Sequence, residues 1–391
     1  MKRMFMPAAL ACAVALAGCA SLPLAPLPKP PPGLFLDTAF GAPSPPIDAK
    51  DVFTLSPAMR HYLEVEIAPQ LRSMGAQRGL VDALHRGAQL RLDYDTDVTR
   101  TAAEAFDARA GNCLSLVVMS AALAKHLALP VRYQALVGQE AWSRSGDLFF
   151  VNGHVNLTVA RRLVDRLNAF DPDTRFQLEF GALPVGRGSL LREVSEATIV
   201  SMFMNNRAAE ALVRGAVAEA YAYAREAVLQ APDNAGAYNT LGVIYQRRGL
   251  AAAAELAYGH ALSRDSEHRA ALLNLARLLD AQGRSSEAAP WRAKLARLEA
   301  EPPFHYFDLG RAAAQAGDFR AARELILREM RRDPDYHEFH FWLAVALSGL
   351  GEIGPAREHL TKAMNNSTTR QAQAIYASKL QSLAPLAVRS Q

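Results

Sequence analysis

Small residues recur in the second half of the chain at a constant spacing of 34 positions, between stretches that alternate apolar and polar residues with helical period. A glycine and, five positions later, an alanine recur together. Glycine can turn the chain, and a small residue lets two helices approach closely. The pattern predicts about five stacked helix pairs over residues 196–391. The recurring residues are Gly215, Gly249, Gly283, Gly317 and Gly351, with Ala220, Ala254, Ala288, Ala322 and Ala356.

A leucine followed by a small residue keeps the same spacing, for example as Leu241-Gly242 and Leu309-Gly310. This set of positions resembles the tetratricopeptide repeat, a helix–turn–helix unit of 34 residues. The resemblance implies an all-α solenoid whose groove receives a protein or peptide substrate or partner.

Helices are also predicted in the first part of residues 51–195. Ser56-Pro57 is typical of a helix start, with serine as N-cap and proline at the first helical position. Apolar residues then recur at helical spacing. Further helices are predicted around Leu80 to Leu92 and from Cys113 to about Leu127. The apolar residues of the first helix are Leu63, Ile67 and Leu71.

The period changes to two after Pro130. Val131 to Val137 alternates as in a half-buried strand. Asn152-Gly153 lies between two apolar runs and predicts a tight hairpin turn. A further strand is predicted over Leu167 to Phe170. Residues 51–195 are therefore predicted to form an α+β domain, with helices first and an antiparallel sheet after them.

The first eighteen residues are typical of an export signal. Lys2 and Arg3 precede an apolar run from Met4 to Ala17 that is too short to remain as a membrane-spanning helix. Leu16-Ala17-Gly18-Cys19 resembles the lipobox of bacterial lipoproteins. The resemblance implies cleavage before Cys19, which then carries the lipid anchor, and Ala20 implies the outer membrane, facing the periplasm. An ordinary secreted protein and a chance match are the alternatives.

Residues 19–50 are predicted to form a tether between this anchor and the folded part. Nine prolines lie between Pro23 and Pro46, and such a composition favours an extended, semi-rigid spacer. Without Lys2 and Arg3 the formal charge of +4 falls to +2. So small a charge speaks against nucleic acid as a partner.

No cofactor or metal is predicted. The chain has no phosphate loop, no dinucleotide fingerprint and no cysteine-rich zinc pattern. His337 and His340 are three positions apart, which differs from the four-residue spacing of the zinc protease motif. We expect them on a solvated helix face.

Cysteine counting directs attention to Cys113. Cys12 leaves with the signal and Cys19 is used for the lipid, so no intramolecular disulfide is possible. Cys113 follows Gly111-Asn112 at a predicted helix start, where amide donors and the helix macrodipole stabilise a thiolate. A nucleophile also needs an adjacent base, and the base needs an orienting acceptor. His154 on a strand and Asp171 at the end of the next are candidates.

A cysteine that opens a helix, followed by a histidine and an aspartate on neighbouring strands, resembles the transglutaminase-like superfamily. The resemblance covers about 120 residues and implies a papain-like fold. It also implies Cys113 as nucleophile, His154 as general base and Asp171 as the residue that orients it. A buried core thiol, a strand histidine and a turn before Pro172 remain the structural alternatives.

Three functions follow from these patterns. With water as acceptor the site makes a cysteine peptidase or amidase, and with a lysine amine it makes a crosslinking transamidase. The third is a non-enzymatic envelope assembly scaffold. The Cys113 N–H is the first candidate for an oxyanion donor, and Tyr94 or Gln139 could mark a second. Trp142 could form a substrate wall or serve packing.

Overall fold

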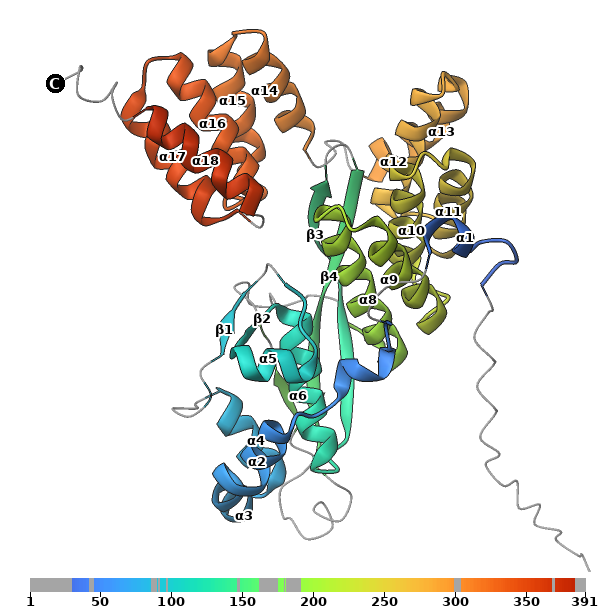
Figure 1. The fold of residues 1–391 in the computed structure, drawn as a ribbon, viewed down its shortest axis with the longest axis vertical. Coiled ribbons are helices and arrows are strands. Elements are labelled where there is room, and N and C mark those ends of the chain that lie inside the picture. Colours follow the sequence, from blue (N-terminus) through green and yellow to red (C-terminus); the bar gives the residue numbers. More distant parts are fainter. Residues whose placement is uncertain are drawn as a thin grey trace, which may run out of the picture.

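The computed structural model describes residues 30–41, 46–85, 90, 92–95, 98–145, 148–161, 175–178, 180, 191–298, 304–367 and 370–383. An α+β part comes first, and paired helices follow it to the end of the described chain (Figure 1). Within these ranges, no helix combines the length and the apolar character needed to cross a membrane.

The helices of the α+β part follow the predicted order with one changed boundary. Ser56 caps α2 (Pro57–His61) by accepting a hydrogen bond from the N–H of Met59. The chain continues through a short π-helix (Tyr62–Glu66) into α3 (Ala68–Met74). The helix predicted over residues 80–92 is α4 (Ala76–His85), because it starts directly after Gly75, whose φ is +81°. Leu90 and Leu92 lie outside it, so this boundary prediction was wrong.

Four antiparallel strands form the main sheet in the order β5-β4-β3-β6. They are β3 (Val131–Ser145), β4 (Leu148–Val159), β5 (Phe176–Leu178) and β6 (Leu191–Val194). A separate two-residue parallel pair joins β1 (Asp93–Tyr94) to β2 (Ala110–Gly111). The prediction of an antiparallel sheet after the helices is confirmed. The strand predicted over 167–170 lies outside the described residues.

The predicted turn at Asn152-Gly153 was wrong. Both residues lie within β4 and pair with Ala141 and Glu140 of β3. The chain reverses between Ser145 and Leu148 instead. Asparagine and glycine permit a turn, but they also tolerate extended backbone, and here pairing with a long neighbouring strand decides the conformation.

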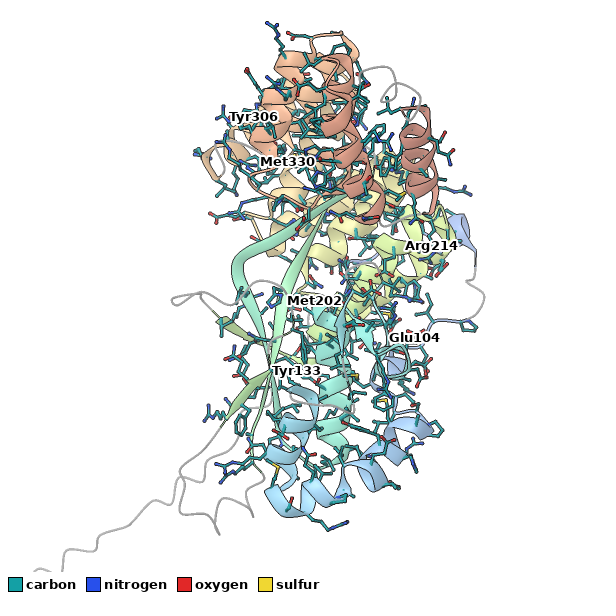
Figure 2. The ribbon with its side chains drawn as sticks, turned by 90° about the vertical axis from the view of Figure 1, so that its left-hand side faces the viewer. Glu104, Tyr133, Met202, Arg214, Tyr306 and Met330 are labelled. Atoms are coloured by element: carbon teal, nitrogen blue, oxygen red, sulfur yellow. The ribbon has the colours of Figure 1, made fainter. Side chains whose placement is uncertain are left out.

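Helix α6 (Cys113–His126) is the centre of the α+β part, since eleven of its fourteen residues are buried. It packs against β4, and both elements belong to one apolar core (Figure 1). Tyr133 on β3, labelled in Figure 2, donates a hydrogen bond to Glu196 at the start of the next helix (2.7 Å). Burial, with this hydrogen bond, raises the pKa of Tyr133.

The rest of the described chain is helical, as predicted. All five recurring glycines have φ between +76° and +82°, and all five recurring alanines are fully buried. Each glycine therefore makes the left-handed turn that ends one helix, and each alanine lies where helices meet. The helix pairs are α8 (Glu196–Val213) and α9 (Val217–Gln230); α10 (Ala235–Arg247) and α11 (Ala251–Arg264); α12 (Arg269–Ala281) and α13 (Ser285–Leu298); α14 (His305–Gln315) and α15 (Phe319–Glu329); and α16 (His337–Gly349) and α17 (Ile353–Asn365), followed by α18 (Arg370–Ser382).

Close approach explains the small residue after the recurring leucine. A Cβ atom added to Gly242 on α10 would lie 2.5 Å from the Tyr258 ring on α11. Tyr258 is fully buried, and its hydroxyl donates to Gln246 (2.8 Å), so the ring has no open space to move into. Only glycine fits at this crossing.

Strand β4 lies against α10 and α12, the first helices of two successive units (Figure 1). Helix α10 is buried almost all round, from Ala237 to Tyr245 without interruption. The first helices of a repeat array otherwise leave one face open as a groove. The long β3–β4 hairpin therefore covers the groove side of these units.

The last part of the predicted tether packs onto the repeats. Residues 30–41 contain α1 (Asp37–Phe40), and the Phe40 ring stacks on Tyr221 of α9 with 4.1 Å between ring centroids. The Tyr245 hydroxyl of α10 donates to the carbonyl of Leu34 (2.6 Å), which is buried. Residues 30–41 are thus attached to the first two helix pairs.

Candidate functional site

The N-terminus of α6 is built as the sequence predicts. Asn112 is the N-cap, and its Oδ1 accepts hydrogen bonds from the N–H (2.9 Å) and the hydroxyl (2.8 Å) of Ser115. Gly111 is needed directly before it, because a Cβ there would lie 2.7 Å from the Ser115 Cβ. These contacts determine where α6 begins and make Cys113 its first residue.

Cys113 is half-buried, and its sulfur is a thiol that takes part in no disulfide. The first N–H groups of a helix have no acceptor within the helix, and they form the positive end of its macrodipole. A helix N-terminus generally favours the thiolate form of a cysteine, whereas an apolar core favours the thiol. Cys113 also packs against the apolar core of the α+β part, so its position is compatible with a nucleophile and with a packing residue.

His154 lies on β4, half-buried, at an irregular point of the sheet. Val155 pairs with Ala135 and Gly153 pairs with Glu140, so His154 alone faces four residues of β3. Irregularities of this kind redirect side chains and are common beside active sites.

Cys113 opens α6 and His154 lies on β4, and these two elements pack against each other. From Cys113 to the end of α6 is about 20 Å at the rise of an α-helix. From His154 to the end of β4 is about 17 Å at the rise of a strand. Both elements end at the same side of the domain, where the N–H of Ala160 donates to the carbonyl of Pro130 (2.9 Å). The structure thus packs the helix that begins with Cys113 against the strand that carries His154, and these lengths are compatible with a site formed by both residues.

The structure describes the other predicted site residues only in part or not at all. Asp171 lies outside the described residues. The backbone of Tyr94, Gln139 and Trp142 is described, in β1 and β3, but their side chains are not. The proposed orienting carboxylate and second oxyanion donor therefore stay predictions.

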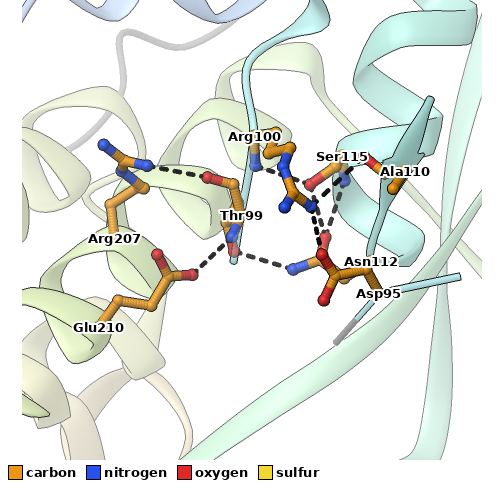
Figure 3. Close-up of polar contacts among 8 residues, drawn as sticks. All are labelled: Asp95, Thr99, Arg100, Ala110, Asn112, Ser115, Arg207 and Glu210. Atoms are coloured by element: carbon orange, nitrogen blue, oxygen red, sulfur yellow. Dashed lines mark hydrogen bonds and ion pairs between the residues drawn. The ribbon is translucent and has the colours of Figure 1, made fainter. Parts of the chain in front are cut away.

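A polar network that the sequence analysis missed surrounds the N-terminus of α6 (Figure 3). Arg100 donates to Ser115 Oγ through its N–H (2.8 Å) and pairs with Asp95 through its guanidinium (2.7 Å). Thr99 accepts a hydrogen bond from Asn112 and contacts two residues of α8. No spacing rule links these segments, because the partners are up to 111 positions apart.

The two histidines expected on a solvated face are in fact packed between helices, so that prediction was wrong. His340 on α16 is buried, and its Nδ1 lies 2.9 Å from Nδ1 of His359 on α17. His337 Nδ1 lies 2.8 Å from the Tyr376 hydroxyl on α18. The sequence does not show these contacts, because both partners come from later helices.

The His340–His359 pair predicts a pH-dependent stability of the last repeats. Burial, the His359 ring and Lys362 lower the pKa of His340 to about 4, while Asp335 opposes the shift; burial and Lys362 also lower the pKa of His359, against Glu358. Between about pH 6.5 and pH 4 the unfolded chain binds more protons than the folded one, so stability falls as the pH falls. We expect a loss of roughly 2 kcal/mol across this window.

Chemical unfolding followed by circular dichroism at pH 7 and pH 4.5 measures this loss. His359→Gln removes one imidazole, so its free energy of unfolding should fall clearly less between pH 7 and pH 4.5 than that of the wild type. His305→Gln, at an exposed position of α14, is the matched control and should behave as the wild type. An identical loss in all three proteins would show that the pair is not its source.

Among the described residues, no group of three or more histidine, cysteine, aspartate or glutamate side chains is arranged to hold a metal ion.

The comparisons with known proteins bear on the helical half. The tetratricopeptide repeat family model matches residues 239–302 and 307–364. No curated protein matches the chain. Solved structures similar to the chain include Pseudomonas aeruginosa PilF, with 22% identity over 47% of this chain and 92% of that one (TM-score 0.31). A tetratricopeptide repeat protein of Thermus thermophilus has 16% identity over 46% of this chain and 99% of that one (TM-score 0.34). The C-terminal part of the chain therefore consists of tetratricopeptide repeats.

Proposed function

We propose that this protein is a thiol-dependent acyl-transfer enzyme, a cysteine peptidase or amidase that acts on a protein of the bacterial envelope. In this proposal Cys19 carries a lipid that anchors the chain to the outer membrane on its periplasmic side. The α+β part provides the catalytic site in a transglutaminase-like fold, and the repeats recruit the substrate.

The observation that supports the proposal most is the position of Cys113. It is the first residue of a buried central helix, its start is determined by an asparagine N-cap, and that helix packs on the strand that carries His154. Cys113 also packs against the apolar core, but packing alone does not require a position at a helix start. The predicted order of nucleophile and base is thus compatible with the fold.

The chemistry follows from these groups. His154 takes the thiol proton, and the Cys113 sulfur forms a bond to the carbonyl carbon of an amide while the carbonyl electrons move to the oxygen. The Cys113 N–H stabilises that oxyanion. When the C–N bond breaks, His154 gives its proton to the leaving amine. Water then attacks the thioester and loses a proton to His154, which returns it to the sulfur as the carboxylic acid leaves.

The substrate is expected to dock on the last repeats. Strand β4 already covers α10 and α12, so the first helices α14 and α16 are the more accessible part of the array. Binding there would raise the effective concentration of a protein substrate at the thiol.

A protein-interaction scaffold without catalysis is the second candidate. It is favoured by the family match, which covers only the repeats. Under this function the half-buried thiol would react like an ordinary cysteine.

Alkylation of Cys113 by iodoacetamide tests the proposal. At pH 7 we expect the Cys113 peptide of the purified mature protein, followed by mass spectrometry, to react about tenfold faster than free cysteine, because a stabilised thiolate predominates. His154→Ala should return the rate toward that of free cysteine. His126→Ala, at the opposite end of α6, is the control and should leave the rate unchanged. A wild-type rate no higher than that of free cysteine, insensitive to His154→Ala, would leave only the scaffold.

A further inference from the structure

Helix α8, the first helix of the repeat array, binds both the backbone N–H and the carbonyl of Thr99 (Figure 3). The Thr99 N–H donates to Glu210 Oε1 (2.8 Å), and its carbonyl accepts from Arg207 Nη1 (3.1 Å). Thr99 itself is fully buried. A buried backbone N–H and carbonyl each need a partner, and here both partners are charged side chains of one helix.

The Thr99 side chain connects α8 to the start of α6. Asn112 Nδ2 donates to the Thr99 hydroxyl oxygen (2.9 Å), while Asn112 Oδ1 caps the helix through Ser115. The amide of Asn112 is therefore fully oriented, with its nitrogen toward Thr99 and its oxygen toward the first turn. Two hydrogen bonds in series thus run from α8 through Thr99 to Asn112, the residue before Cys113.

Glu210 is a partly buried carboxylate that lies beside Arg207. Burial raises its pKa, which the hydrogen bonds from Thr99 and the charge of Arg207 only partly offset. Its Oε2 is buried without a hydrogen-bond partner among the described residues. Arg207 in turn donates to the Tyr223 hydroxyl of α9 (3.3 Å) and lies over that ring. Desolvating such a group is costly, and the hydrogen bond from the Thr99 N–H offsets part of that cost.

We propose that Glu210 and Arg207 are positioning residues for the thiol site: through Thr99 and Asn112 they hold the first turn of α6, and with it the N–H groups around the Cys113 sulfur, in the orientation that favours a thiolate. The assignment rests on Cys113 being the nucleophile proposed above. It makes the first repeat helix part of the catalytic unit, since its side chains complete the support of the helix start.

The pH dependence of Cys113 alkylation by iodoacetamide in the full mature chain tests this role. Glu210→Ala should move the midpoint of the pH–rate profile upward and lower the rate at pH 6.5 about fivefold. Glu210→Gln keeps an oxygen acceptor for the Thr99 N–H and should recover most of that rate. Glu219→Ala, at a partly exposed carboxylate on α9 that pairs with Arg214 (3.0 Å), is the control and should match the wild type.

Thr99→Val removes the hydroxyl that accepts the hydrogen bond from Asn112, while valine keeps nearly the same side-chain shape as threonine. It should shift the profile in the same direction as Glu210→Ala, and it decides the matter if Glu210→Ala does not fold. Folded variants with a lower melting temperature but the wild-type pH–rate profile would show that Glu210 and Thr99 have only a structural role, and would overturn the proposal for Glu210 and Arg207. In that case a fast-reacting thiol in the wild type would still support the proposed function. A wild-type thiol no faster than free cysteine would overturn both.

Discussion

Cells in which Cys113→Ala replaces the wild-type protein are expected to accumulate the uncleaved form of at least one envelope protein. Alanine lacks the nucleophile, and loss of a nucleophile removes turnover by a factor of about a thousand or more. Residual background hydrolysis would be too slow to process the substrate within a cell generation. Quantitative comparison of the envelope proteomes of the two strains, at the level of individual peptides, measures the accumulation and names the substrate.

The variant must be shown to fold and to reach the membrane fraction. Because Cys113 is only half-buried, its replacement by alanine should leave the thermal unfolding midpoint close to that of the wild type. If a crosslinked species disappears instead of a cleaved one, the acceptor is an amine and the enzyme is a transamidase. Identical proteomes from a correctly folded, membrane-bound variant would contradict catalysis and favour the scaffold.

Glu329→Ala is expected to destabilise the last repeats by about 3 kcal/mol, because it removes a buried charged acceptor. Glu329 is 1% exposed and accepts hydrogen bonds from the N–H groups of Phe304 (3.0 Å), Tyr306 (2.9 Å) and Phe307 (3.3 Å). A carboxylate of α15 thus caps α14, whose preceding residue Phe304 has φ +64° and offers no side-chain cap of its own.

The repeat pattern by itself would favour this substitution. At the equivalent position three of the other four units have alanine (Ala227, Ala261 and Ala363), and the fourth has Leu295. The structure predicts the opposite, since α14 would lose its cap. Urea unfolding followed by circular dichroism gives the loss, and amide hydrogen exchange should locate it at the start of α14.

Glu324→Ala is the matched control for this change, because Glu324 is an exposed carboxylate on the same helix. Its replacement should change the free energy of unfolding by no more than about 0.5 kcal/mol. Equal stability of the two variants would contradict the capping role of Glu329.

Local conformational requirements explain which predictions from the sequence hold. A left-handed backbone at Gly215 and its four counterparts is accessible to glycine at little cost, so the repeat is visible without any tertiary information. The same holds for Ser56 and Asn112, each of whose side chains accepts a hydrogen bond from a backbone N–H three residues away. The start of α6 at Cys113, half of the candidate site, could therefore be predicted.

Long-range pairing explains what could not be predicted. Asn152-Gly153 has the local chemistry of a turn, yet pairing with β3 keeps it extended. His340 has the spacing of a surface residue, yet a histidine of the next helix buries it. Thr99 shows no signal at all, because its partner Glu210 is 111 positions away. The amino-acid sequence by itself determined the repeat, the helix starts and the candidate nucleophile, since each depends on the backbone preferences of a few adjacent residues. Only the tertiary structure decided that β4 covers the groove side of α10 and α12 and that α8 supports the start of α6, because such contacts arise when distant segments must bury apolar surface and satisfy polar groups together.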